Sequence, residues 1–228
     1  MILYSLFNSQ PIYAIAFIIA YISSILVAMS VHEWAHAFVA YKQGDGTAKS
    51  MKRLSLKPFD HVDPIGFACL LIFGFGWAKP VPVDSRNYKH GKWSEFFVSI
   101  AGVLFNIIIA LLTSLLYCLF YYVWPAFSQG TAFYPTALNL FLNFSIIINL
   151  SLAFFNLLPI YPLDGFRVVE SFTSRNNKFT SFMRNYSTIL MLLLFISGIF
   201  TVYIDITAIN VSDLLILMWS KFLNLIGL

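Results

Sequence analysis

The chain has 228 residues, of which 59% are hydrophobic and only 11% are charged. This composition excludes an ordinary soluble domain and is typical of a protein that crosses the membrane several times. The formal net charge of +4, without a run that mixes basic and aromatic residues, does not favour nucleic-acid binding. We expect a single membrane-embedded domain over residues 1–228. Its predicted fold is an all-α polytopic membrane protein with about five transmembrane helices, a re-entrant or interfacial segment and short edge strands.

The first predicted span, residues 11–41, is almost wholly apolar and contains His32-Glu33-Trp34-Ala35-His36. It begins at a proline, which suits a first helical position, and it ends before the glycines of residues 44–46. At ~1.5 Å per residue this helix is longer than the ~30 Å hydrocarbon core, so it should tilt or protrude.

The motif in this span points to a metal. In a helix, His32 and His36 lie one turn apart on the same face. Two imidazoles at that spacing can bind one Zn²⁺, and Glu33 can act as the base for a water molecule on the metal. The same pattern arises by chance in soluble helices. Within an apolar span, unused ionisable side chains would cost several kcal/mol, which favours the zinc site.

The segment after the first span is polar and basic, and its alternation at 51–56 predicts a short strand at the membrane edge. Residues 63–77 follow, with an apolar core too short for a span, and they predict a re-entrant or interfacial helix. Residues 76–83 contain two prolines and are expected to be extended, at an edge.

Four further spans are predicted downstream. Gly102 in the second span should permit a close helix contact, and Asn106, four residues later, needs a partner in the bilayer. Cys69 and Cys118 lie in apolar stretches without CxxC spacing and are interpreted as packing residues. The last two spans should form an αα pair bent near residues 205–210. The predicted ranges are 93–124, 136–158, 186–203 and 211–226.

The distribution of basic residues predicts the orientation. Residues 42–57, 79–92 and 167–184 contain thirteen of the fourteen Lys and Arg residues. All three groups fall on one face of the membrane if residues 63–77 re-enter, whereas they would be split if that segment crossed. The positive-inside tendency therefore favours re-entrance, with the N-terminus outside and the histidine motif towards the cytoplasm. The expected location is the plasma (cell) membrane.

A catalytic zinc normally takes three protein ligands, so a third is needed. The candidates are His61, Asp63, His90, Asp164 and Glu170. Asp164 follows a span that ends in two prolines, and irregular backbone at membrane depth is tolerated mainly where it lines a cavity. Its alternative role is to cap the following helix, and Asp63 can likewise cap a helix that starts at the next residue.

Two motifs together resemble the site-2 protease family of intramembrane zinc metalloproteases. They are HEWAH at 32–36 and NLLPIYPLDG at 156–165, and the GDGTAK, HVDPIG and GWAKPVPV strings between them resemble short members without a PDZ insertion or regulatory domain. The resemblance implies that His32, His36 and Asp164 bind one zinc ion per chain. It implies Glu33 as the general base and Asn156 as a polar group near the reacting carbonyl. One departure is Val103, where the family often has proline.

The function that this resemblance implies is hydrolysis of peptide bonds within or near the transmembrane segments of single-span membrane proteins, as in regulated intramembrane proteolysis. Membrane lipids and the substrate are the expected partners, without nucleic acid. The alternatives are a zinc or cation transporter and a catalytically idle metal-binding membrane protein. A transporter has no use for Glu33 as a residue that does not bind the metal. A serine or aspartyl intramembrane protease is not favoured, because this chain lacks a suitable Ser–His or Asp–Asp pair within its spans.

Overall fold

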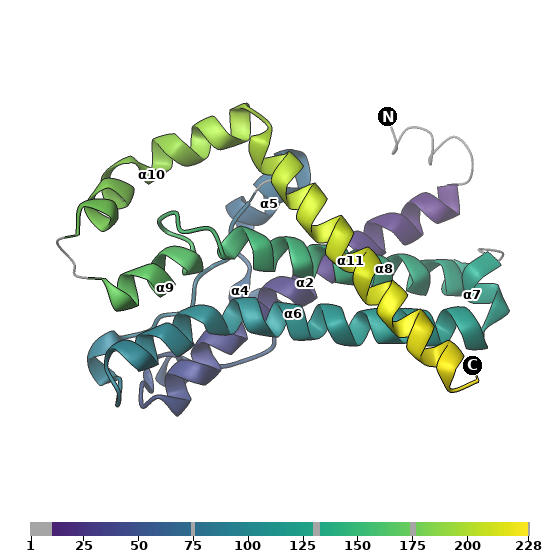
Figure 1. Cartoon of the computed structure of the whole chain (residues 1–228), viewed down its shortest axis with the longest axis horizontal. Helices are drawn as coiled ribbons and strands as arrows, with labels where there is room; N and C mark the ends of the chain where they lie inside the picture. Colours follow the sequence, from purple (N-terminus) through teal and green to yellow (C-terminus); the bar gives the residue numbers. More distant parts are fainter. Residues whose placement is uncertain (1–10, 74–75, 130–132, 174–176, 228) are drawn as a thin grey trace. The chain divides into compact units, whose positions relative to one another are not determined.

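The structure is a computed structural model that describes residues 11–73, 76–129, 133–173 and 177–227, which are mostly helical (Figure 1). The helices begin and end as follows: α2 Pro11–Lys42, α3 Thr47–Ser50, α4 Pro58–His61, α5 Pro64–Phe73, the 3₁₀ turn η1 Ser85–Asn87, α6 Lys92–Val123, α7 Pro125–Gln129, α8 Phe133–Asn156, α9 Asp164–Phe172, α10 Lys178–Ile196 and α11 Ile199–Leu225.

Five of the described helices, α2, α6, α8, α10 and α11, are long and apolar enough to cross a membrane. This confirms the prediction of a multi-pass helical membrane protein. The predicted bend at 205–210 is wrong, because α11 runs through those residues without a break. The break lies at Gly198, whose φ of 71° is in the left-handed region that glycine adopts readily. The polar residues at 205–210 are accommodated within the helix.

The predicted edge strands are also wrong. Among the described residues the structure has a single antiparallel bridge, Val62 with Ala78, and no sheet. The alternation at 51–56 follows the short helix α3 and does not pair with another strand. Instead, the guanidinium of Arg53 donates hydrogen bonds to the carbonyl oxygens of Lys79, at 2.8 Å, and Pro80, at 3.3 Å. A side chain therefore takes the acceptors that a strand would need.

The segment predicted to re-enter contains the ten-residue helix α5. Asp63 caps it, since its carboxylate accepts a hydrogen bond from Gly66 N at 2.8 Å. Beyond the helix the chain returns to its starting point: Lys79 N donates to His61 O at 2.8 Å, beside the Val62–Ala78 bridge. A Cβ on Gly66 would lie 2.2 Å from Trp77 O, so this close return requires glycine. Residues 74 and 75 lie outside the described part.

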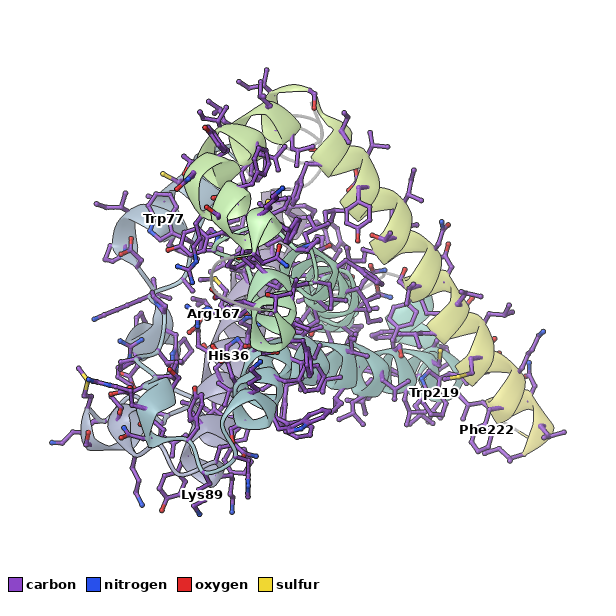
Figure 2. The ribbon with its side chains drawn as sticks, turned by 60° about the vertical axis from the view of Figure 1, so that its left-hand side comes forward. His36, Trp77, Lys89, Arg167, Trp219 and Phe222 are labelled. Atoms are coloured by element: carbon purple, nitrogen blue, oxygen red, sulfur yellow. The ribbon has the colours of Figure 1, made fainter. Side chains whose placement is uncertain are left out.

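The chain divides into two compact units, and α2, α6, α8 and α11 contribute to both. The first unit comprises the described parts of 1–28, 107–150 and 207–228. Its helices are joined by aromatic contacts, such as the edge-to-face pair Phe17–Phe144, and by polar bonds. Trp219 donates from Nε1 to Ser114 Oγ at 3.1 Å (Figure 2). Cys118 is buried here, as expected for a packing residue.

The second unit comprises the described parts of 29–106 and 151–206 and contains every residue singled out for chemistry. The fully buried carboxylate of Asp45, just beyond α2, organises its loops. It accepts hydrogen bonds from Thr47 N, Asp84 N and Asn87 Nδ2. Lys89 N donates to Gln43 O at 2.9 Å, one residue beyond the end of α2. These bonds hold the loop after residue 79 against α2.

Candidate metal centre

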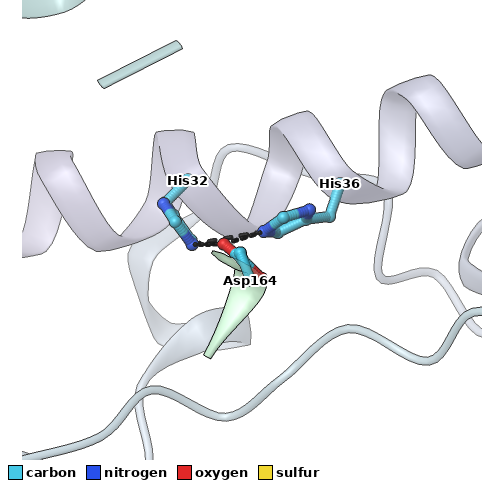
Figure 3. Close-up of side chains that lie close together, drawn as sticks. All are labelled: His32, His36 and Asp164. Carbon is cyan, nitrogen blue, oxygen red and sulfur yellow. Dashed lines mark hydrogen bonds and ion pairs between the residues drawn. The ribbon is translucent and has the colours of Figure 1, made fainter. Parts of the chain in front are cut away.

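The two histidines of α2 meet the carboxylate of Asp164 (Figure 3). Their Nε2 atoms are 3.2 Å apart, and Oδ2 of Asp164 lies 3.1 Å from each. Ligands held about 2.0–2.2 Å from one tetrahedral zinc ion lie roughly 3.3–3.6 Å from one another. The three atoms lie slightly closer together than this, near enough to share a single ion, and they form the candidate metal group found among the described residues.

The outer nitrogens of the histidines show that this group fits a cation. Nδ1 of His32 lies 2.6 Å from Asn106 Oδ1, and Nδ1 of His36 lies 2.7 Å from Val98 O. Both partners are acceptors, so each Nδ1 carries the proton and donates. Each Nε2 then presents a lone pair towards Asp164. In that tautomer two lone pairs and a carboxylate oxygen converge, and a bound cation between them would offset their repulsion.

A glycine on α6 makes this approach possible. A Cβ on Gly102 would lie 2.5 Å from Cε1 of His32 and 2.5 Å from Nε2 of His36. Its neighbours Ala101 and Val103 are buried, and α6 continues through Val103 without a break. Gly102 therefore sits against the histidine pair itself, which is a more specific role than the close helix contact that the sequence predicted.

Asp164 reaches the histidines from the first residue of α9. It is not the N-cap, which is Leu163, so the capping alternative does not describe its role. Gly165 holds this end of α9 against the end of α8, since a Cβ there would lie 2.2 Å from Leu157 O. Asp164 therefore faces the histidine pair from a helix end that is packed closely against the end of α8.

Glu33 is buried, and its carboxylate is held by the backbone. Oε2 of Glu33 accepts a hydrogen bond from Val81 N at 2.8 Å. Val81 stands between Pro80 and Pro82, which have no N–H, so it is the one amide donor in this tripeptide. Glu33 lines the same cavity as the three candidate ligands. It is therefore fixed beside the candidate metal position without being one of the ligands.

Asn156 also lines the cavity, at the last residue of α8. Its Nδ2 donates to Leu152 O at 3.0 Å, within its own helix. Arg167, one turn after Asp164 on α9, lies on the wall of the same cavity. The sequence did not predict Arg167 at this site, and the residue was noted only among the basic residues that indicate orientation.

The other candidate ligands lie elsewhere. His61 is buried and donates from Nε2 to Ser55 O at 2.7 Å, and Asp63 caps α5. Glu170 is paired with Arg184. Neither these residues nor His90 line the cavity at the histidine pair.

Sequence reasoning did not find three groups that shape the site: the amide oxygen of Asn106, the carbonyl of Val98 and the N–H of Val81. A polar residue within an apolar span was the signal for Asn106, and its partner is now seen to be His32. The two backbone atoms carry no residue type. Only the Pro-Val-Pro sequence, which leaves one amide donor, hinted at the second of them.

Comparison with known proteins identifies a family for this chain. Residues 20–197 match the family model described as Peptidase family M50. The chain is 43% identical over 148 residues to "Putative zinc metalloprotease YwhC" of Bacillus subtilis, which covers 64% of this chain and 66% of that one. It is 28% identical over 203 residues to "Zinc metalloprotease MJ0392" of Methanocaldococcus jannaschii, covering 88% and 47%. The chain thus spans about half to two thirds of the length of these relatives. No solved structure matches it at a comparable significance.

Proposed function

The chain belongs to peptidase family M50, the site-2 protease family, and on that basis we propose that this membrane metalloprotease is an intramembrane zinc endopeptidase of the HExxH type. The observation that carries the proposal is the convergence of His32, His36 and Asp164 in one cavity with Glu33, on a helix apolar enough to span a membrane. A site of this kind provides three ligands and leaves an open position, as catalytic zinc requires.

The residues would divide the reaction among them. His32, His36 and Asp164 would hold the zinc ion, which when bound supplies a Lewis acid that activates water near neutral pH. Glu33 takes a proton from the attacking water and returns it to the leaving amine nitrogen. Asn156, whose amide now bonds within α8, would turn towards the carbonyl oxygen as negative charge develops there.

The proposed substrate is a single-span membrane protein, cleaved within or near its span, in the manner of regulated intramembrane proteolysis. The scissile segment must be unwound first, because the carbonyls of a membrane helix are hydrogen-bonded along the helix. The positive-inside tendency supports an active site towards the cytoplasm, in the plasma membrane. Lipids and the substrate remain the proposed partners.

Glu33→Gln, in purified protein, tests this function. The variant should keep its zinc content, because Glu33 is not a ligand, and should lose cleavage of a single-span substrate on the order of 10²-fold or more. Asp164→Ala is the matched variant, and it should lose the metal itself. Chelation should abolish cleavage by the wild type, and added zinc should restore it.

Two results would contradict the proposal. One is cleavage by Glu33→Gln at the wild-type rate. The other is zinc flux through liposomes that contain the wild type without any cleavage of substrate, which would favour a transporter.

A further inference from the structure

Arg167 places a guanidinium in the wall of the active-site cavity. It lies three residues after Asp164 on α9, so both project from one side of the helix. Figure 2 shows Arg167 and His36, which come from different helices, at the same part of the molecule, and both line the cavity. Arg167 is exposed there, whereas His36 is buried.

The other polar side chains of the cavity are already engaged. Glu33 accepts from Val81 N, Ser99 Oγ donates to Glu95 O at 2.8 Å, and Asn156 donates to Leu152 O. The candidate ligands contact one another.

Arg167 differs from these groups. Its side chain makes no hydrogen bond or ion pair among the residues that the structure describes. The other acidic residue of α9, Glu170, is paired with Arg184. Burial raises the pKa of Tyr88 above its usual range, and the charge of Arg167 acts against that rise. The guanidinium thus lies within electrostatic reach of Tyr88, in the loop that follows residue 79.

We propose that Arg167 binds an acidic side chain of the peptide that is cleaved, close to the scissile bond; this rests on the proposed function. Part of the cavity wall is apolar, formed by Pro80, Val81, Val83 and Val98. A cation facing such a wall gains most from an ionised partner, because charge-assisted hydrogen bonds are about twice as strong as neutral ones. The planar guanidinium matches a carboxylate with two parallel N–H donors, whereas a backbone carbonyl offers a single oxygen.

The test uses a single-span substrate in which each position beside the cleavage site carries Glu, Gln or Lys in turn. At one position the wild type should have a KM for Glu that is about tenfold lower than for Gln, with kcat little changed. Arg167→Gln should remove this preference. Arg167→Glu should reverse it, so that Lys becomes the better residue, and Arg167→Lys should keep a weaker preference for Glu. Zinc content should be the same in all four proteins.

Arg86→Gln is the matched control, because Arg86 is an exposed arginine paired with Asp84 outside the cavity. It should keep the wild-type preference. A fall in kcat of Arg167→Gln that is equal for all peptides would overturn the proposal, as would a failure of Arg167→Glu to favour Lys. If the wild type cleaves the substrate variants without any charge preference, the role of Arg167 is overturned while the proposed function stands. One that cleaves none of them overturns the proposed function together with it.

Discussion

At the scale of single residues, each imidazole of the pair uses its two nitrogens differently. Nδ1 donates to a fixed oxygen, and Nε2 is left as a lone pair. The oxygen partner of His32 is a side chain, Asn106, which mutation can reach, whereas that of His36 is the carbonyl of Val98. Such outer partners orient the ring and raise the basicity of the ligating nitrogen.

Asn106→Leu should therefore weaken zinc binding by about 10–100-fold, because Nδ1 of His32 would lose its acceptor and the ring its orientation. Asn106→Asp keeps an acceptor at the same place and should bind zinc close to the wild-type affinity. Competition with a chromophoric chelator in detergent gives both values. Equal affinities for the leucine variant and the wild type would show that the 2.6 Å contact has no part in holding the ligand.

At the scale of elements, α2 and α6 are set at the spacing that the histidine pair needs. α6 supplies both the glycine that faces the rings and the acceptors for their outer nitrogens. Helix interfaces within membranes favour small residues because these let the backbones approach closely. Here the close approach also determines whether the candidate ligands can keep their orientation.

Gly102→Ala should lower zinc affinity while the helices remain folded. The added Cβ would lie 2.5 Å from atoms of both His32 and His36, so the rings must turn or α6 must move away. Gly46→Ala is the matched control, because a Cβ there meets nothing within 4 Å. Zinc titration together with circular dichroism separates loss of the site from loss of the fold. Wild-type affinity in Gly102→Ala would contradict this account of the interface.

The elements that sequence could predict are those whose signal is local. Long apolar runs predicted α2 and the other spans, and the spacing of His32 and His36 predicted that they meet. The strand at 51–56 was mispredicted because Arg53 bonds to the backbone near Lys79, a contact between distant parts of the chain that alternation does not encode. The bend near 205–210 was misplaced because the polar residues there were taken as a helix end, whereas the break between α10 and α11 lies at Gly198.

At the scale of the whole molecule, basic charge and the course of residues 63–77 lead to the same topology. The two ends of that segment are hydrogen-bonded to each other at His61 and Lys79, so a single crossing would have to break that contact. With five helices of spanning length, the proposed orientation with the N-terminus outside would leave the basic groups together on the cytoplasmic face.

Single cysteines should report this topology in a background where Cys69 and Cys118 are replaced by serine. Cysteines introduced at Ser50 and Ser85 should both react with a membrane-impermeant thiol reagent from the cytoplasmic side, because residues 63–77 return to the face from which they start. One at Ser128 should react from the outside. Labelling of the Ser50 and Ser85 positions from opposite faces would show that the segment crosses.

In Pro80-Val81-Pro82 only the middle residue has a backbone N–H, and this limits the changes of length that the loop can accept. A loop that follows a short helix ordinarily tolerates changes of length. Here the amide that holds Glu33 has a proline nitrogen on either side, so a shift of one residue in either direction places a position without N–H opposite a buried carboxylate. An insertion and a deletion between Trp77 and Pro80 should therefore both be harmful. The number of residues between α5 and Val81 is fixed, because no neighbouring position can supply the amide that Glu33 needs.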